Sequence, residues 1–174
     1  MPTEEGNIIT FSDTTEGNTF FYQKDPFIGF SHVQGMYPKG DFLNEFTGLF
    51  LCTILIFINT GRFTYGRKMR RDLIADSFIY LPQTFEGKPD WETIEDYMEN
   101  LHSKPITTEI KSRHIPLNTE KWGRFKVKDL FYVRKGKRLT AEDQTEGNIS
   151  YIGAIDSNTE NSKITLIETG INQS

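Results

Sequence analysis

Apolar and polar residues change their spacing along the chain, and this predicts strands first, then helices, then strands again. Short apolar runs at Asn7–Phe11 and Thr19–Tyr22 flank a turn-like stretch at Asp13–Asn18. Further turns are expected up to about residue 40, because three residues punctuate that stretch: Pro26, Gly29 and Gly35.

The most apolar stretch of the chain is the ten-residue run Leu49–Ile58. A membrane-spanning helix needs roughly 20 predominantly apolar residues, so this run is too short to be one. The pattern instead predicts a helix over Asp41–Asn59 that is buried on nearly all sides. Its start signal is Gly40-Asp41, and Asn59-Thr60-Gly61 ends it.

A second, amphipathic helix is expected from Asp90, its N-cap, to about Ser103. Pro105 then breaks the pattern, and Ile106–Arg113 is a candidate short helix. The apolar seam of the amphipathic helix has helical spacing and consists of Trp91, Ile94, Met98 and Leu101.

The remaining segments predict short strands joined by turns. Lys68–Asp76 is expected to be irregular or a short helix, Lys128–Leu130 a tight turn or a single helical turn, and Ala141–Gln144 one helical turn. The expected strands are Phe78–Leu81, Phe125–Val127, Phe131–Val133, Ile149–Ile152 and one within Ile164–Ile167. We therefore predict an α+β fold: a mixed, β-rich domain with one buried helix and a projecting helical segment.

Composition sets limits on the class of protein. The chain has 174 residues, 36% of them hydrophobic and 13% aromatic, which is enough for one globular core. Cys52 is the sole cysteine, so an internal disulfide and a thiolate zinc site are excluded. The acidic N-terminus is unlike a signal peptide, and a cytoplasmic location without membrane attachment is expected.

Charge is strongly segregated, although the net charge is only −4. Gly61–Arg71 carries five basic residues and no acidic one, and Lys121–Arg138 carries eight against Asp129 alone. By contrast, Glu86–Glu99 carries six acidic residues against Lys88. Each block taken alone fits an ordinary solvated surface. Two basic blocks with interleaved aromatic residues also fit a face that binds nucleic acid.

Catalytic motifs are scarce. The three histidines are far apart in sequence, and neither a nucleophile elbow nor a phosphate-binding loop is present, so no metal or cofactor is expected. Pro89-Asp90 with Glu109-Ile110-Lys111 matches the loose PD…(D/E)xK pattern of metal-dependent nucleases. Helix capping explains Asp90 better, and a nuclease remains the less favoured alternative.

Two stretches resemble the specificity subunits of type I restriction–modification systems and of related type II systems. The first runs from Trp122-Gly123-Arg124-Phe125 to Gly147-Asn148-Ile149-Ser150-Tyr151-Ile152 and resembles the opening of a target-recognition domain. The second runs from Gly6-Asn7-Ile8-Ile9 to Gly87-Lys88-Pro89-Asp90-Trp91 and resembles the closing half of such a domain.

The order of these halves is reversed relative to the family. The resemblance implies a closing half at 1–85, a helical spacer segment at 86–115 and an opening half at 116–174. Two accounts remain open: a circular permutation, in which the halves fold together, or a fragment spanning the end of one domain and the start of the next.

The resemblance implies a non-catalytic protein that recognises a specific double-stranded DNA sequence and presents it to modification (methyltransferase) and restriction subunits. A chain with one recognition domain would read half a bipartite target, and a homodimer would supply the second half. The apolar seam of the amphipathic helix would contact the modification subunit or pack on its own domain. The competing interpretation is a protein-interaction module that binds the modification subunit without DNA.

If the chain recognises DNA, the expected DNA-contacting residues are Arg62, Tyr65, Arg67, Lys68, Arg70, Arg71, Lys135, Lys137, Arg138, Ser157 and Asn158.

Overall fold

Nine strands and four α-helices make up the parts of the chain that the computed structural model describes. These parts are residues 2–14, 19–29, 32–64, 66–102 and 118–136, together with the backbone of 144–152 and 162–166. The elements are β1 (Ile8–Ser12), β2 (Phe20–Gln23), β3 (Ile28–Gly29), β4 (Val33–Pro38), α1 (Glu45–Asn59), α2 (Arg71–Ala75), β5 (Phe78–Pro82), α3 (Trp91–His102), a 3-10 turn (Thr119–Lys121), β6 (Trp122–Lys126), α4 (Val127–Leu130), β7 (Phe131–Lys135), β8 (Gln144–Ile152) and β9 (Ser162–Leu166).

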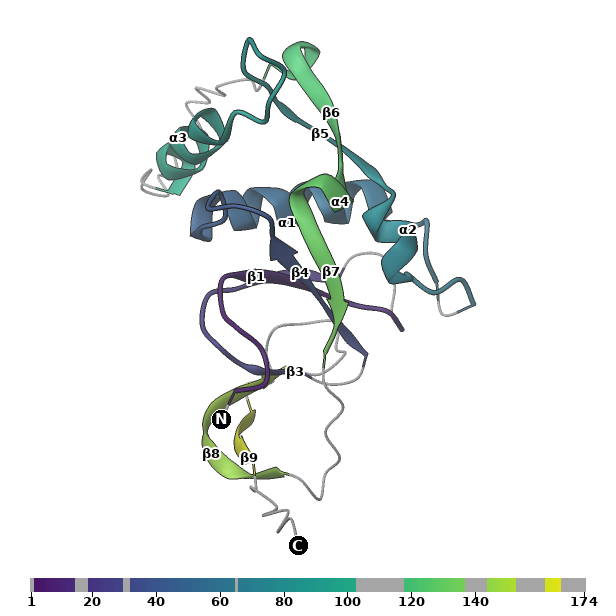
Figure 1. The fold of residues 1–174 in the computed structure, drawn as a ribbon, viewed down its shortest axis with the longest axis vertical. Coiled ribbons are helices and arrows are strands. Elements are labelled where there is room, and N and C mark those ends of the chain that lie inside the picture. Colours follow the sequence, from purple (N-terminus) through teal and green to yellow (C-terminus); the bar gives the residue numbers. More distant parts are fainter. Residues whose placement is uncertain are drawn as a thin grey trace, which may run out of the picture.

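The largest sheet has four antiparallel strands in the order β2-β1-β4-β7 (Figure 1). Its first three strands come from the N-terminal 40 residues, whereas β7 follows α3 in the chain. Strand β4 pairs with β7 over five positions, from Gln34 opposite Lys135 to Pro38 opposite Phe131. Residues nearly one hundred positions apart are thereby neighbours in one sheet.

The two smaller sheets also combine strands from before and after α3. Strand β5 pairs with β6 in an antiparallel ribbon, with Phe78 opposite Lys126 and Pro82 opposite Trp122. Strand β3 pairs in parallel with β8, which in turn pairs with β9. Every described sheet is therefore built from both ends of the sequence.

Helix α1 begins later than predicted. Its N-cap is Asn44, whose side chain accepts hydrogen bonds from the backbone N–H groups of Phe46 and Thr47 at 2.9 and 3.1 Å. Thr47 completes a capping box, because its hydroxyl accepts from the Asn44 N–H at 2.8 Å. The polar residues just before the apolar run are thus the helix start. The predicted end is confirmed, with Thr60 as the C-cap.

The expectation that α1 is buried on nearly all sides is wrong. Leu51 and Leu55 are fully buried, but Leu49 and Phe57 on the opposite side are 45% and 81% exposed. The helix is therefore covered on only part of its circumference. On the covered side, the ring of Tyr22 on β2 lies so close to Gly48 that a Cβ atom at residue 48 would be 2.5 Å from the Tyr22 Cδ2 atom. Among the described residues, no helix is both long and apolar enough to span a bilayer.

Helix α3 also departs from its prediction, because its described part does not project. It packs against α1, on the side of α1 away from the four-stranded sheet (Figure 1). The Trp91 ring stacks on Phe42 with centroids 4.2 Å apart, and Ile94 is completely buried in the core. The predicted start is confirmed, since the Asp90 carboxylate accepts from the Thr93 N–H at 3.1 Å.

Most other boundaries follow the pattern, but two strands, β3 and β4, were overlooked. Of the helical turn expected at Ala141–Gln144, residues 141–143 lie outside the described residues. The turn expected at Lys128–Leu130 is α4, and the strands expected on either side of it are β6 and β7. Gln144 belongs to β8 and not to a helical turn, because it pairs with Leu166. Strand β4 escaped prediction because Gly35, Gln34 and Pro38 make its sequence resemble a loop.

The start of α1 gives a direct test of the fold. Replacing Asn44 with Ala leaves two backbone N–H groups without their acceptor, and we expect this to lower the free energy of unfolding by about 0.5–2 kcal/mol. Thr53→Ala, on the exposed side of the same helix, is the matched control and should change it by less than about 0.5 kcal/mol. Urea unfolding followed by circular dichroism measures both; equal effects would contradict the assigned cap.

Candidate nucleic-acid interface

The first basic stretch leaves the end of α1 and enters α2. Arg62 donates from its guanidinium to the Ile58 carbonyl at 3.4 Å, a favourable position for a cation at a helix C-terminus. Arg67 and Lys68 are exposed in a short loop closed by backbone bonds between Thr64 and Arg67. Arg71 is exposed and has no ion pair among the described residues.

Arg70 is partly neutralised by its neighbour. Its guanidinium donates two hydrogen bonds to the Asp72 carboxylate, one of them from Nε at 3.0 Å. These bonds lower the pKa of Asp72 and raise the pKa of Arg70. Arg70 is therefore less available to a DNA phosphate than Arg71.

The described basic residues of the second stretch are spread over four elements: the 3-10 turn, β6, α4 and β7. On β6, the Arg124 guanidinium lies 3.5 Å from the centroid of the Phe78 ring, and the Lys126 ammonium lies 5.1 Å from it. On α4, Lys128 forms an ion pair with Asp76 at 2.7 Å, which ties α4 to the end of α2. Lys135 at the end of β7 is exposed.

The two stretches meet around Asp13, just past the end of β1. Arg70 and Arg71 line a surface hollow of about 480 Å³ together with Asp13. Asp13 accepts a hydrogen bond from the Gln34 side chain at 2.9 Å, and Gln34 is the direct sheet partner of Lys135. Helix α2 also packs on β7 (Figure 1). We call this surface the basic edge; it comprises Arg67, Lys68, Arg70, Arg71 and Lys135.

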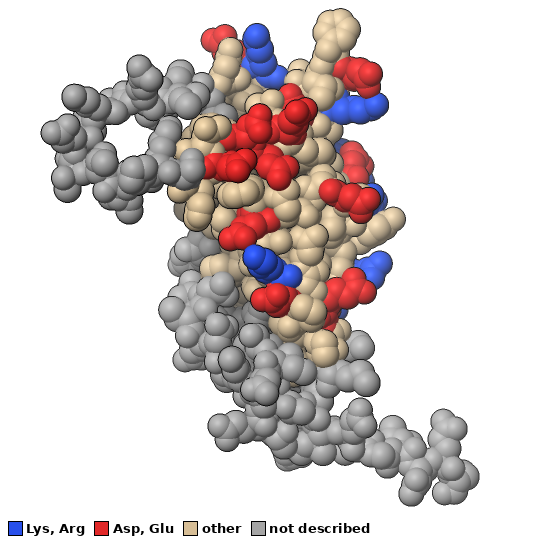
Figure 2. All heavy atoms as spheres, turned by 90° about the vertical axis from the view of Figure 1, so that its left-hand side faces the viewer, with Lys and Arg blue, Asp and Glu red and all other residues tan. Residues whose placement is uncertain are grey.

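A different face of the molecule is acidic. Figure 2 shows acidic side chains gathered around α3, on the side away from α2 in Figure 1. Glu92, Asp96 and Glu99 are exposed there, and none of them forms an ion pair with a described residue. The charge segregation in the sequence is therefore preserved in space.

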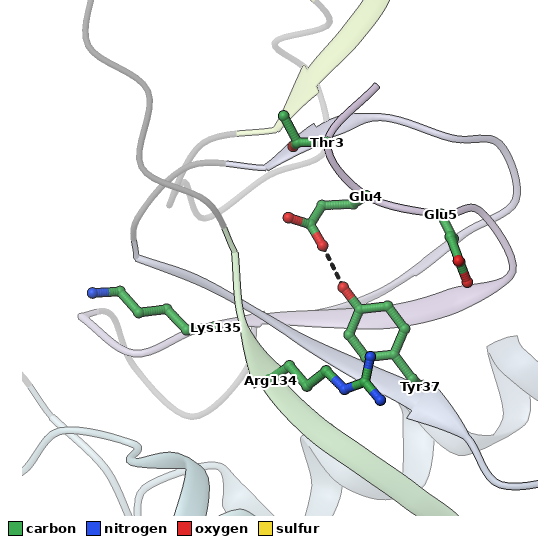
Figure 3. Close-up of a pocket in the computed structure, with 6 residues that line it drawn as sticks. All are labelled: Thr3, Glu4, Glu5, Tyr37, Arg134 and Lys135. Carbon is green, nitrogen blue, oxygen red and sulfur yellow. Dashed lines mark hydrogen bonds between the residues drawn. The ribbon is translucent and has the colours of Figure 1, made fainter. Parts of the chain in front are cut away.

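A second, smaller hollow beside β7 contains a residue absent from the predicted DNA contacts. It has a volume of about 260 Å³ and is lined by Thr3, Glu4, Glu5, Tyr37, Arg134 and Lys135 (Figure 3). The Tyr37 hydroxyl donates to the Glu4 carboxylate, and burial together with this bond raises the pKa of Tyr37. The Arg134 guanidinium faces the Tyr37 ring, 5.0 Å from its centroid.

Several predicted contacts lie outside the described residues: Tyr65, Lys137, Arg138, Ser157 and Asn158. The described ones are Arg62 at the end of α1, Arg67 and Lys68 in the loop after it, Arg70 and Arg71 at the start of α2, and Lys135 at the end of β7. The packing of α2 on β7 brings the start of α2 towards Lys135. Arg134 was not among the expected DNA contacts. Its contact with the Tyr37 ring depends on the pairing of β4 with β7, and the sequence near Arg134 carries no signal of that pairing.

The predicted seam of α3 faces its own domain. Ile94 is completely buried, while Trp91 and Met98 are partly buried and packed against the core. The sequence left two roles open for this seam, contact with the modification subunit or packing on its own domain. These three residues pack on their own domain. Leu101 differs, being 54% exposed in the last turn of α3.

Nothing in the described part of the chain gathers three metal-ligating side chains. Asp90 acts as the cap of α3, while Glu109 and Lys111 of the nuclease pattern lie outside the described residues. Cys52 is buried in α1, and this burial raises the pKa of its thiol to about 12. A thiol with this pKa is a poor nucleophile.

Comparison with known proteins gives one informative relative. The chain is 31% identical over 161 residues to S.BcgI, the specificity subunit of a type II restriction enzyme from Heyndrickxia coagulans. The match covers 87% of this chain and 45% of the relative, so the chain spans about half the relative's length. No family model matches the chain. No solved structure matches it either.

The ion pair between α2 and α4 predicts a pH dependence of stability. Lys128 lowers the pKa of Asp76 in the folded protein, so the pair stabilises the fold above the usual aspartate pKa of about 3.9 and loses this effect as the pH falls through the lowered value. Asp76→Asn should therefore reduce the thermal midpoint at pH 7, and the difference from wild type should shrink below about pH 4.

Thermal unfolding between pH 3 and pH 7 measures this difference, with Asp129→Asn on the exposed side of α4 as the control. A difference that stays constant over this range would contradict the assigned pair.

Proposed function

We propose that the chain recognises a specific sequence in double-stranded DNA. Two observations support this proposal: the chain is related over most of its length to a specificity subunit of a restriction–modification system, and it carries the basic edge. It would present that sequence to a modification (methyltransferase) subunit and to a restriction subunit or activity. The protein itself would carry out no chemistry on the DNA.

The observation that carries this proposal is the convergence of two basic stretches at one edge of the sheet. Arg71 of the first stretch and Lys135 of the second both border the Asp13–Gln34 hydrogen bond. Cations that neutralise phosphates supply most of the affinity of a protein for DNA, and they do so only when one surface presents several of them. The DNA-facing surface would be the basic edge.

The three shared sheets support the permuted arrangement over the fragment. In a fragment spanning two domains, residues 1–85 and 116–174 would have no reason to pair with each other. Here β4 pairs with β7, β5 with β6 and β3 with β8. We propose that these two segments are the closing and opening halves of one recognition domain, with residues 86–115 joining them.

Such a domain would read one half of a bipartite target. A second copy related by a two-fold axis would read the other half and give a palindromic site. The relative of about twice the length is consistent with two reading units in one chain. The acidic outer side of α3, with exposed Leu101 at its end, is the surface we assign to the modification subunit.

The second candidate function, a protein-interaction module without DNA binding, is favoured only by this acidic side of α3. It predicts capture of the modification subunit and no salt-sensitive binding to a duplex.

The proposed dimer is tested by light scattering of the chain at micromolar concentration, with and without the modification subunit. A monomer under both conditions would count against the dimer.

Removing the cations at the end of β7 should weaken binding to all duplexes. Replacing Lys135, Lys137 and Arg138 with Ala should lower affinity regardless of DNA sequence and reduce the slope of log affinity against log salt by up to about 3. Fluorescence anisotropy at several salt concentrations measures this slope. Unchanged affinity would remove this segment from the interface.

Sequence recognition itself is tested with a randomised duplex pool. The chain, with and without its modification subunit, is bound to the pool, and the retained duplexes are sequenced. We expect one enriched motif, because a recognition domain contacts base edges as well as phosphates. Retention without enrichment would mean non-specific binding and would contradict the proposal.

A further inference from the structure

Arg134, on the edge strand β7, has its guanidinium close to two tyrosine rings. Arg134 lies 5.0 Å from the centroid of Tyr37 and 5.5 Å from that of Tyr132, both within the range of a cation–π contact. Tyr37 and Tyr132 are directly opposite each other on β4 and β7. The rings restrict the arginine, while its donors form no ion pair or side-chain hydrogen bond with a described residue.

The position of the Tyr37 ring is fixed from two sides. Its hydroxyl donates to Glu4, and its ring lies over Gly35, where a Cβ would approach the Tyr37 Cε2 atom to 2.7 Å. Gly35 is in turn the sheet partner of Arg134. The ring thus fills the space that a side chain at residue 35 would take, and it stands beside the arginine.

Charge around the hollow argues against a phosphate contact for this arginine. Glu4 and Glu5 line the hollow together with Arg134 and Lys135, and the two carboxylates would repel a phosphate that approached the Arg134 guanidinium beside Tyr37. In Figure 3 the Lys135 side chain points away from Glu4, Tyr37 and the Arg134 guanidinium. The two adjacent residues of β7 therefore direct their side chains to different sides, and of the two the Arg134 guanidinium lies against the Tyr37 ring.

We propose that Arg134 reads a guanine in the DNA target, with Tyr37 as the residue that positions it. An arginine donates two hydrogen bonds to the O6 and N7 acceptors of guanine in the major groove, and these acceptors carry no net charge that nearby carboxylates would repel. An edge strand with its antiparallel neighbour is narrow enough to enter that groove. This inference rests on the proposed DNA recognition and assigns one base contact within it.

The test compares Arg134→Ala, Arg134→Lys and the control Lys135→Ala by selection from the randomised duplex pool. Both Arg134 variants should lose the preference for guanine at one position of the motif, because lysine keeps the charge but not the two-pronged donor. Lys135→Ala should keep the motif and bind all duplexes more weakly. Tyr37→Phe, which keeps the ring but loses the Glu4 bond, should weaken the preference for guanine.

A second measurement uses the selected duplex with 7-deazaguanine at that position, which removes the N7 acceptor. We expect wild-type affinity to fall, by less than the roughly 5- to 150-fold that a complete bidentate base contact supplies because O6 remains, and Arg134→Ala to show no further loss. Circular dichroism verifies that every variant is folded.

The outcomes separate this inference from the function on which it rests. A pool without any enriched motif for the wild type overturns the proposed function, and the base contact with it. If the wild type selects a motif that Arg134→Lys retains, Arg134 reads no base and the inference is wrong. A motif and affinity unchanged in Arg134→Ala would limit the residue to packing between the rings.

Discussion

The antiparallel pairing of β4 with β7 is the constraint on which the remaining structure depends. Strand β7 is an edge strand brought in from beyond α3, and its first residue, Phe131, is buried beside the Phe42 ring that also stacks on Trp91. One strand pairing therefore fixes the sheet edge and links it to the contact that seats α3. Because β7 carries Arg134 and Lys135, the same pairing also decides which cations of the second basic stretch reach the first.

This arrangement explains how an acidic chain can present a basic surface. Two of the acidic residues that neighbour the first stretch form ion pairs, Asp72 with the adjacent Arg70 and Asp76 with Lys128 of α4, and the unpaired acidic residues of α3 face another side. A local ion pair at the surface contributes little to stability, so these pairs chiefly adjust which cations remain available. Arg71 and Lys135 are left without a described ion pair at the point where the two stretches meet.

The sequence predicted the class of fold and most elements because local signals coincide with them. The periodic seam and the Asp90 cap of α3, and the turn at α4, required no knowledge of distant residues. Strand β4 and the exposed side of α1 were missed for a common reason: each depends on what packs against it. Gly35 in a strand resembles a turn until the Tyr37 ring that occupies its side-chain space is known. The same limit hid Arg134, whose character comes from rings on two paired strands.

The central claim is that the basic edge, and not the acidic side of α3, contacts DNA. Amide hydrogen exchange of the chain with and without the duplex enriched from the pool tests it most directly. The account predicts slower exchange in residues 66–71 and 131–136 on binding, with residues 91–102 unchanged. Protection confined to residues 91–102, with none at the basic edge, would contradict it.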